Sequence, residues 1–259
     1  MQVNKDLARR RFSRAARSYN MSCEPQTLMA ERLMALLDSD SPASILELGC
    51  GTGLLTEKLR HAYPTADITA VDIAPGMIQE CRQTPCASQS VSFVVGDAEN
   101  LLIDAEFDLI VSSSCFQWLS DLSGTMQSLV HRLAHGRSLA FSAPTLGSLP
   151  ELWESYLAVS GKEAGHRLPE PGDYIRSVIE AGLTLESAAT EKHSFLYEDP
   201  EQAIRALHEI GASRAGRNGH GLTPAQLNAM LQYYSDTFSQ ADGRVPLTYN
   251  VQYIQARRK

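Results

Sequence analysis

Long apolar runs and paired cysteines are missing from this sequence. No uninterrupted apolar stretch approaches the roughly 18 residues of a membrane-spanning helix. The charged residues 1–11 contain no apolar stretch of the kind found in a secretory signal. The five cysteines are an odd number without a C-x-x-C pair, which is typical of reduced thiols. We therefore expect a cytoplasmic protein with no membrane contact.

An excess of positive charge is also missing. The chain has 23 lysines and arginines against 30 aspartates and glutamates, a formal net charge of −7. This balance argues against a protein that binds nucleic acid through its overall charge. No metal site is expected, because His131 and His135 have ligand spacing on an expected helix but Arg132 replaces the glutamate of the H-E-x-x-H motif.

Strand-type and helix-type segments alternate through the first 145 residues. Near-continuous apolar strands between helices indicate a mostly parallel sheet that is covered on both faces. We therefore predict an α/β protein with a Rossmann-like, doubly wound sheet. The expected strands are residues 45–49, 68–72, 91–95, 107–112 and 138–142, with later ones at 184–195 and 248–256. The expected helices between the early strands are residues 54–61, 76–82 and 125–134.

The chain divides into an N-terminal helical segment, residues 1–40, and one domain over residues 41–259. Within the domain, residues from about 145 to 180 and from about 198 to 240 are rich in glycine, proline and tyrosine. We expect these two stretches to be helical inserts that cover the ligand edge of the sheet.

The N-terminal segment contains an amphipathic helix over residues 5–19. One face collects Ala8, Phe12, Ala15 and Tyr19, and the opposite face collects Arg10, Arg14 and Arg17. We expect the aromatic face to pack on the core. The arginine face is then either a solvated surface or a surface that binds an anionic partner.

Three alternate glycines follow an acid where the first expected strand meets a helix. They form the pattern Glu47, Gly49, Gly51 and Gly53. Glycines suit a tight turn whose backbone lies close to a ligand. A dinucleotide fingerprint reads G-x-G-x-x-G, whereas here the third glycine comes one residue early, and Glu47 would repel a diphosphate. Because an acid attracts a cation, the pattern favours S-adenosylmethionine, which carries a sulfonium and an ammonium group.

Two further acids follow the next two expected strands. Ligands of such sheets bind beyond the carboxyl ends of the strands. Asp72 can accept hydrogen bonds from both hydroxyls of a ribose, or it can cap the helix that begins near Pro75. Asp97 can accept a hydrogen bond from the amino group of adenine, or it can stabilise a turn.

These residues resemble the class I S-adenosylmethionine-dependent methyltransferases over roughly residues 40–145. The resemblance implies that the glycine loop wraps the methionine part of the cofactor. It also implies that Asp72 holds the ribose and that Asp97 lies near adenine. The rest of the implied cofactor site consists of Ile73, Met77, Ala98 and Ser113.

A second set of motifs resembles the malonyl-acyl carrier protein methyltransferases of biotin synthesis nearly from end to end. These motifs occupy residues 12–19, 116–119, 147–152, 167–169, 211–212 and 243–249. The family implies attack of a malonyl carboxylate on the sulfonium methyl, which gives a methyl ester. A carboxylate is already ionised at neutral pH, so no general base is expected.

Holding the malonyl carboxylate calls for a cation or for hydroxyl donors. Arg167 is the first candidate for the cation, as a charge-assisted clamp. The other candidates are alternative cations, phenolic donors and residues that line the methyl site: Arg137 and Arg244, Tyr19 and Tyr249, and Gln117 and Trp118.

An acidic carrier protein needs a basic surface on an enzyme whose net charge is negative. Arg10, Arg14 and Arg17 are the expected docking surface, and Arg214 with Arg217 forms a second basic patch. Two alternatives stay open at this point. One is a methyltransferase for a free small carboxylic acid or a quinone-type ring, and the other is a non-catalytic regulator that binds S-adenosylmethionine.

Overall fold

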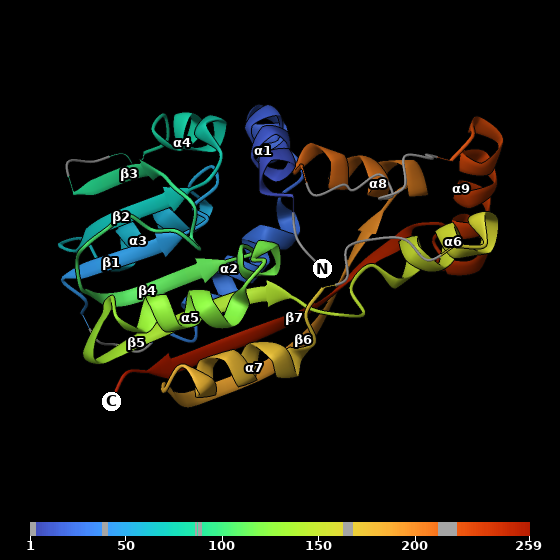
Figure 1. Cartoon of the computed structure of the whole chain (residues 1–259). Coiled ribbons are helices and arrows are strands. Elements are labelled where there is room, and N and C mark those ends of the chain that lie inside the picture. Colours follow the sequence, from blue (N-terminus) through green and yellow to red (C-terminus); the bar gives the residue numbers. More distant parts are fainter. Residues whose placement is uncertain (1–3, 38–40, 86, 88–89, 163–167, 212–221) are drawn as a thin grey trace.

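One sheet lies at the centre of the computed structural model, which describes residues 4–37, 41–85, 87, 90–162, 168–211 and 222–259. Its strands are β1 (Ser44–Leu48), β2 (Asp67–Asp72), β3 (Val91–Val95), β4 (Phe107–Ser113), β5 (Leu133–Pro144), β6 (Thr184–Tyr197) and β7 (Val245–Arg257). Across the sheet they follow the order β3-β2-β1-β4-β5-β7-β6 (Figure 1).

The strand directions are those of a doubly wound sheet. The chain enters at β1, moves outward through β2 and β3, and returns to add β4 and β5 on the other side of β1, all in parallel. β7 is the exception, because it pairs antiparallel with both β5 and β6. The predicted α/β class with a mostly parallel sheet is confirmed. The strand order reverses between β1 and β4, which is where such sheets bind ligands.

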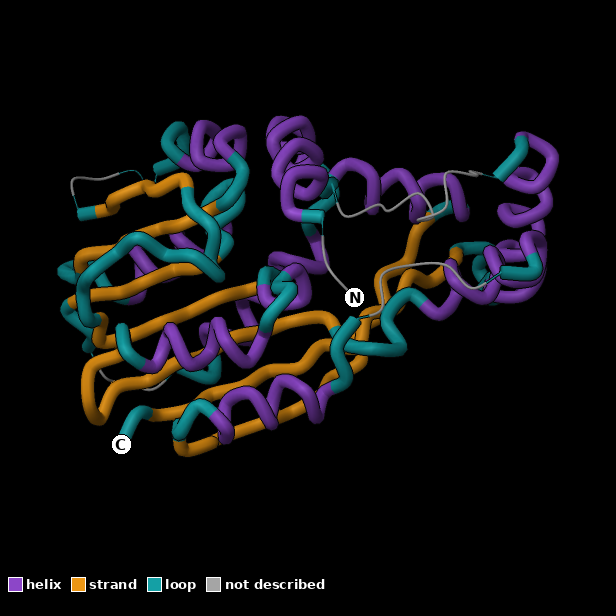
Figure 2. The backbone as a smooth tube through the Cα atoms, in the orientation of Figure 1, coloured by secondary structure: helices purple, strands orange, loops and turns teal. Residues whose placement is uncertain are grey.

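Helices cover both faces of the sheet (Figure 2). They are α1 (Lys5–Tyr19), α2 (Glu24–Met34), α3 (Leu54–Ala62), α4 (Pro75–Cys81), α5 (Leu122–Val130), α6 (Pro150–Ser160), α7 (Pro171–Glu180), α8 (Pro200–Glu209), α9 (Pro224–Phe238) and the short 3-10 helix η1 (Phe116–Trp118). Five of the α-helices begin at a proline, whose missing N–H would have no partner in the first turn. None of the described helices is both long and apolar enough to cross a membrane.

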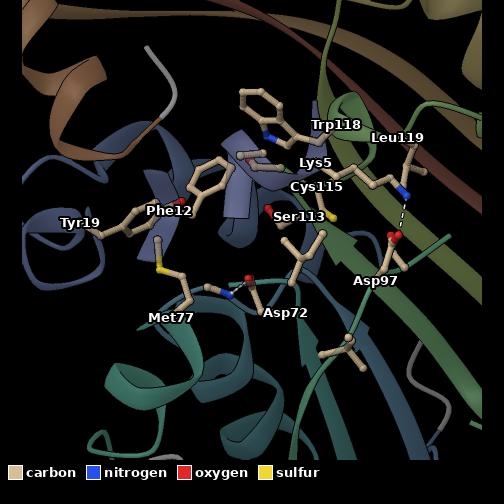
Figure 3. A pocket seen from close by; sticks show the side chains of 18 residues that line it. Lys5, Phe12, Tyr19, Asp72, Met77, Asp97, Ser113, Cys115, Trp118 and Leu119 are labelled. Carbon is tan, nitrogen blue, oxygen red and sulfur yellow. Dashed lines mark hydrogen bonds and ion pairs between the residues drawn. The ribbon is translucent and has the colours of Figure 1, made fainter. Parts of the chain in front are cut away.

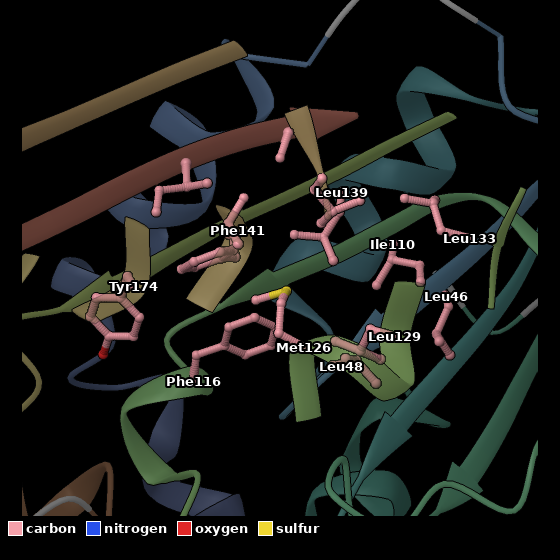
Figure 4. Packing of buried hydrophobic residues seen from close by; sticks show 14 of the residues in the cluster. Leu46, Leu48, Ile110, Phe116, Met126, Leu129, Leu133, Leu139, Phe141 and Tyr174 are labelled. Atoms are coloured by element: carbon pink, nitrogen blue, oxygen red, sulfur yellow. The ribbon is translucent and has the colours of Figure 1, made fainter. Parts of the chain in front are cut away.

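Alternation along the strands builds a separate core on each face of the sheet. In β1, Leu46 and Leu48 join the core beneath α5 and α7, whereas Ile45 joins the core beneath α2 and α3. Figure 4 shows the first of these cores, in which the rings of Phe116 and Phe141 lie 4.6 Å apart. Burial of Phe116 therefore anchors η1 on the sheet, directly before Trp118.

The boundary between α5 and β5 differs from the prediction. The expected helix over residues 125–134 ends at Val130, and β5 already begins at Leu133, which pairs with Phe107 of β4. Polar residues and a glycine between Leu133 and Ser138 hide the start of this strand in the sequence. His131 and His135 consequently do not share a helix, and the metal-ligand spacing has no structural basis.

β6 and β7 continue beyond the carboxyl end of β5 as a two-stranded ribbon. β5 ends at Pro144, which pairs with Val251, whereas the β6–β7 pairing continues to Tyr197 and Val245. α6 and α9 pack on each other and on this ribbon around a core of their own. In Figure 1 this part projects from the sheet, and α8 spans the space between it and α1.

Residues 145–180 do not all cover the ligand edge, as was expected of this insert. α7 instead lies beside α5 on one face of the sheet. Its buried residues Tyr174, Ser177 and Val178 form a stripe at helical spacing, and this stripe is directed to the sheet core. The buried stripe of α7 therefore decides where the helix packs, although the helix belongs to the insert by its position in the sequence.

Candidate functional site

A pocket lies at the carboxyl ends of β1, β2, β3 and β4, beneath α1 (Figure 3). It encloses about 780 Å³, including solvent at its mouth, which is within the usual range for small-ligand sites. Ten of the predicted site residues line it: Tyr19, Gly49, Gly51, Asp72, Ile73, Met77, Asp97, Ala98, Ser113 and Trp118. The fold thus brings together residues that are far apart in the sequence.

The glycine loop shapes the floor of this pocket. Gly49 has φ +73°, and a Cβ atom there would lie 2.5 Å from Cβ of Cys115, so a side chain is excluded by the protein itself. Gly51 has φ +55°, but a Cβ there would meet no atom within 4 Å. Gly51 therefore leaves open space at the pocket that a ligand can occupy.

Asp72 links the glycine loop to α4. Its Oδ2 accepts a 2.9 Å hydrogen bond from the backbone N–H of Gly51, and its Oδ1 accepts a 2.8 Å bond from that of Ala74, the N-cap residue of α4. Burial raises the pKa of Asp72 to about 6, although both backbone hydrogen bonds act in the opposite direction. Each carboxylate oxygen has more than one acceptor site, so the same group can also accept from the hydroxyls of a ligand.

Asp97 faces Lys5, which extends from the first turn of α1. The Lys5 ammonium lies 2.5 Å from Oδ2 of Asp97 and also pairs with Glu99. Burial alone would raise the pKa of Asp97, but hydrogen bonds from Lys5, from the backbone of Glu99 and from Asn100 lower it overall. The side chain of Asp97 is thus ionised, and it already accepts hydrogen bonds from groups of the protein.

The amphipathic prediction for α1 is confirmed. Ala8, Phe12 and Tyr19 line the pocket, and Ala15 is buried. The rings of Phe12 and Trp118 meet edge to face at 5.3 Å and close one side of the pocket. The opposite face of the helix is exposed and carries Arg10, Arg14 and Arg17.

Tyr19 brings a phenol to the same pocket. Desolvation by burial raises its pKa, and nearby Cys23, Asp72 and Cys115 add to this effect. The phenol is therefore protonated throughout the physiological pH range, and its O–H can donate a hydrogen bond. Cys115 beside it is also neutral, because burial raises the pKa of its thiol to about 12.

Four predicted residues lie outside the lining of the pocket. Glu47 is buried below the glycine loop, where its Oε2 accepts a 2.6 Å hydrogen bond from Thr56 of α3. Gly53 is the N-cap residue of α3, with φ +99°. Gln117 donates through Nε2 to the carbonyl of Ser114 at 2.9 Å, and Tyr249 packs edge to face on Phe195. Their contacts with a ligand stay predictions.

The two described candidates for the carboxylate clamp, Arg137 and Arg244, lie outside the lining of the pocket. Arg137 pairs with Asp108 at 3.1 Å, near the amino ends of β4 and β5, so its proposed role as a clamp is wrong. Arg244 pairs with Asp242 at 2.7 Å at the far end of the ribbon, which also excludes it. Both side chains satisfy their charge locally. The remaining predicted arginines, Arg167, Arg214 and Arg217, lie outside the described residues.

Sequence reasoning missed several residues of the pocket, among them Lys5, Phe12, Ser114 and Cys115. Lys5 is one cation among many in α1 and has no distinguishing pattern. Ser114 has φ +57°, an uncommon conformation for a residue with a side chain, and it directs Cys115 against Gly49. Phe12 lies on the apolar face of the expected helix over residues 5–19, and this pattern was the available signal that its side chain points inward.

The chemistry of the lining fits an adenosyl ligand that carries an amino acid. Asp72 offers acceptors for ribose hydroxyls, Gly51 leaves room over the loop, and Met77 with Trp118 offers apolar surface. Among the described residues, no group of three potential metal ligands occurs.

Known proteins are similar to this sequence over nearly its whole length. Residues 45–136 match the family described as methyltransferase domain. The malonyl-[acyl-carrier protein] O-methyltransferase of Acetivibrio thermocellus is 32% identical over 272 aligned residues, which cover 99% of this chain and 95% of that protein. The protein of the same name from Geobacter sulfurreducens is also 32% identical, over 267 residues that cover 99% and 100%.

Solved structures share the fold at lower identity. The geranyl diphosphate C-methyltransferase of Streptomyces coelicolor A3(2), solved with Mg²⁺, geranyl diphosphate and S-adenosyl-L-homocysteine, aligns with a TM-score of 0.55 and 14% identity. The alignment covers 90% of this chain and 79% of that one. The resemblance of the short motifs is therefore confirmed along the full chain, which belongs to the malonyl-[acyl-carrier protein] O-methyltransferase family.

Proposed function

We propose that this protein transfers the methyl group of S-adenosylmethionine to the free carboxylate of a malonyl group on an acyl carrier protein, as a step of biotin synthesis. The observation that carries the proposal is the similarity to malonyl-[acyl-carrier protein] O-methyltransferases, which are 32% identical to this chain in alignments that cover 99% of it. The pocket below α1 supports it with a lining suited to the adenosyl cofactor. We place this reaction in the cytoplasm, since the four described cysteines have free thiols.

The cofactor supplies a methyl group activated by a positively charged sulfur. In our proposal, Asp72 holds the ribose hydroxyls, and Asp97 with Ala98 lies at the adenine end. Gly49 and Gly51, with Ser113, border the methionine end, while Ile73 and Met77 provide apolar contact. The inclusion of Glu47 and Gly53 rests on the glycine-loop pattern alone, because both lie outside the lining of the pocket.

The reaction needs alignment more than acid–base chemistry. An oxygen of the malonyl carboxylate attacks the methyl carbon, the new O–C bond forms as the C–S bond breaks, and the sulfur keeps the electron pair. Because the carboxylate is ionised at neutral pH, no side chain has to remove a proton. Fixing oxygen, methyl and sulfur in line can supply about 7–11 kcal/mol of the barrier reduction. Exclusion of water from the carboxylate contributes further.

The neutral phenol of Tyr19 is our candidate donor to the malonyl carboxylate, because it lies in the pocket between the glycine loop and α1. Trp118 borders the same space. Arg167 stays the proposed cation on sequence grounds. Gln117 and Tyr249 stay predictions at this site: Gln117 donates to the carbonyl of Ser114 after β4, and Tyr249 is packed in the core of the ribbon.

The carrier protein docks on the exposed arginine face of α1 in this proposal. Arg10 and Arg14 are exposed, and the ion pair of Arg17 with Glu80 is long, at 3.8 Å. Three positive charges therefore face solvent on a protein whose net charge is −7. Such a local patch would steer an acidic carrier toward the pocket that the opposite face of α1 covers.

Release of S-adenosylhomocysteine tests the enzymatic proposal. We expect release with malonyl-carrier protein, and little release with free malonate or with no acceptor. Comparable turnover of free malonate would favour an enzyme for small acids. Binding of S-adenosylmethionine without any turnover on these acceptors would indicate a regulator.

A further inference from the structure

Gln26 presents a buried hydrogen-bond acceptor to the glycine loop. Its Oε1 is buried and has no hydrogen-bond partner among the described residues. A buried amide oxygen without a donor costs about 1–3 kcal/mol, so such groups are rare in folded proteins. This oxygen is therefore expected to accept a hydrogen bond from a donor that is not among the described residues.

The amphipathic pattern of α2 explains why the amide oxygen of Gln26 is buried. Met29, Ala30 and Leu33 form the buried stripe of the helix. Gln26 lies three residues before Met29 and seven before Leu33, so it continues the same stripe. It is a polar residue in a series of apolar ones, at the end of the helix that is nearest the ligand edge.

A hollow of about 300 Å³ lies in front of Gln26. Gly49, Gly51 and Thr52 of the glycine loop line it, together with Tyr19 and Ser113. Tyr19, Gly49, Gly51 and Ser113 also line the main pocket. The hollow therefore continues the main pocket over the glycine loop, and Asp97 is not among its lining residues.

Four backbone N–H groups and one hydroxyl of the glycine loop are already engaged elsewhere. The N–H groups of Gly49 and Cys50 donate to the carbonyl of Val71, and that of Gly51 donates to Asp72. The N–H of Gly53 donates to the carbonyl of Cys50, and the hydroxyl of Thr52 donates to Asn20 at 2.6 Å. These engaged groups do not supply the donor for the Gln26 oxygen, and a ligand in the hollow can bring one.

We propose that Oε1 of Gln26 accepts a hydrogen bond from the α-ammonium group of the bound cofactor. This inference rests on the proposed cofactor and adds a binding residue that no motif identified. The ammonium is a strong donor located at the methionine end of the molecule, and the hollow is at the corresponding end of the pocket. The contact makes the site selective for ligands that carry an amino-acid end.

The test compares two ligands and two substitutions at one position. S-adenosylhomocysteine carries the amino-acid end, whereas 5′-methylthioadenosine lacks it. Gln26→Leu removes the acceptor at similar volume, and Gln26→Glu keeps an acceptor of the same shape. Isothermal titration calorimetry measures both affinities directly and needs no acyl substrate.

We expect Gln26→Leu to weaken S-adenosylhomocysteine binding by about tenfold or more, as for a hydrogen bond to a charged group. Binding of 5′-methylthioadenosine should stay unchanged, which also shows that the variant is folded. Gln26→Glu should bind S-adenosylhomocysteine at least as tightly as the unsubstituted protein. Gln232→Leu, an exposed glutamine on α9, is the matched control and should change neither affinity.

Three results would overturn the inference. Unchanged S-adenosylhomocysteine binding by Gln26→Leu would mean that the amide makes no contact with the ligand. Equal loss for both ligands would indicate general damage to the pocket. Weaker binding by Gln26→Glu than by Gln26→Leu would show that the amide donates to a carboxylate instead. If the unsubstituted protein bound neither ligand, the proposed cofactor itself would be wrong.

Discussion

Asp72 is the residue for which the sequence left a ribose acceptor and a helix cap as alternatives. Its carboxylate lines the pocket and at the same time holds the backbone of Gly51 and Ala74. The carboxylate bonds the N-cap residue Ala74 and not a donor inside α4, so the helix cap is not confirmed and the ribose contact stays a prediction. The backbone bonds fix the carboxylate in place before any ligand arrives.

The pKa of Asp72 predicts how cofactor affinity depends on pH. Burial raises this pKa to about 6, and protonation removes the charge that strengthens hydrogen bonds from hydroxyls. Affinity for S-adenosylhomocysteine should thus be constant above pH 7 and fall below pH 6, by at most about tenfold per pH unit. Calorimetry between pH 5 and 8 measures this. Asp72→Asn should bind more weakly with a flat profile, and a flat profile in the unsubstituted protein would contradict the assignment.

Gly49 and Gly51 should respond differently to alanine. Both have positive φ, which costs about 1–2 kcal/mol for a residue with a side chain. Gly49→Ala adds a collision with Cys115, so its free energy of unfolding in urea should fall by more than about 2 kcal/mol. Gly51→Ala should lose less stability but bind S-adenosylhomocysteine about tenfold more weakly, since its methyl group enters the pocket. The reverse ranking in stability would refute this view of the loop.

Many residues of the pocket could be predicted because they follow strand ends at recognisable spacing. Ten of the predicted site residues line it, and eight of these, from Gly49 to Ser113, were predicted to bind the cofactor. Lys5 and Gln26 escaped prediction because their signals are weak: one is a lysine in a basic helix, and the other is a single glutamine near the start of α2. Their roles depend on how α1 and α2 sit against the sheet, which no local pattern specifies.

At the scale of elements, α1 is fixed over the pocket by contacts at several points. Lys5 pairs with Asp97 and Glu99 at its start, and Ser13 lies against Gly76 of α4 in its middle. Ser18 donates to the carbonyl of Glu209 at the end of α8. The helix thus connects the cofactor edge of the sheet to the ribbon side of the molecule.

Removing the charge of Lys5 should loosen the start of α1. Lys5→Met leaves Asp97 and Glu99 without their cation, and the pKa of Asp97 should rise, because the lysine lowers it. We expect severalfold faster amide hydrogen exchange in the first half of α1. Arg9→Met is the matched control, since Arg9 pairs only with Asp6 of its own helix among the described residues. Equal exchange rates in the two variants would show that the Lys5 ion pairs do not fix the start of α1.

Element boundaries were predicted where apolar patterns are continuous and missed where polar residues interrupt them. β1 to β4 agree with the expected segments within a residue or two. β5 begins five residues early because its start is hidden by polar residues, and α7 lies on the sheet because its own buried stripe decides its position. Ribbon formation by β6 and β7 depends on long-range pairing, which periodicity does not reveal.

At the scale of the whole molecule, the exposed arginines of α1 form a positively charged surface on a protein whose net charge is −7. Replacing Arg10, Arg14 and Arg17 by glutamate should raise the KM for malonyl-carrier protein by about tenfold, because complementary charge is lost at the docking surface. The KM for a malonyl-coenzyme A surrogate should change much less. Arg176→Glu on α7 is a control on another face, where the side chain is also exposed. Equal effects on both substrates would rule out docking on α1.

The central claim is methyl transfer to a carboxylate presented by a carrier protein, and intact mass spectrometry of the carrier tests it most directly. Malonyl-carrier protein is incubated with the protein and S-adenosylmethionine, beside acetyl-carrier protein, which has no free carboxylate. We predict that the malonyl form gains the mass of one methylene group and that the acetyl form gains nothing. No gain on the malonyl form, or an equal gain on both, would contradict the account.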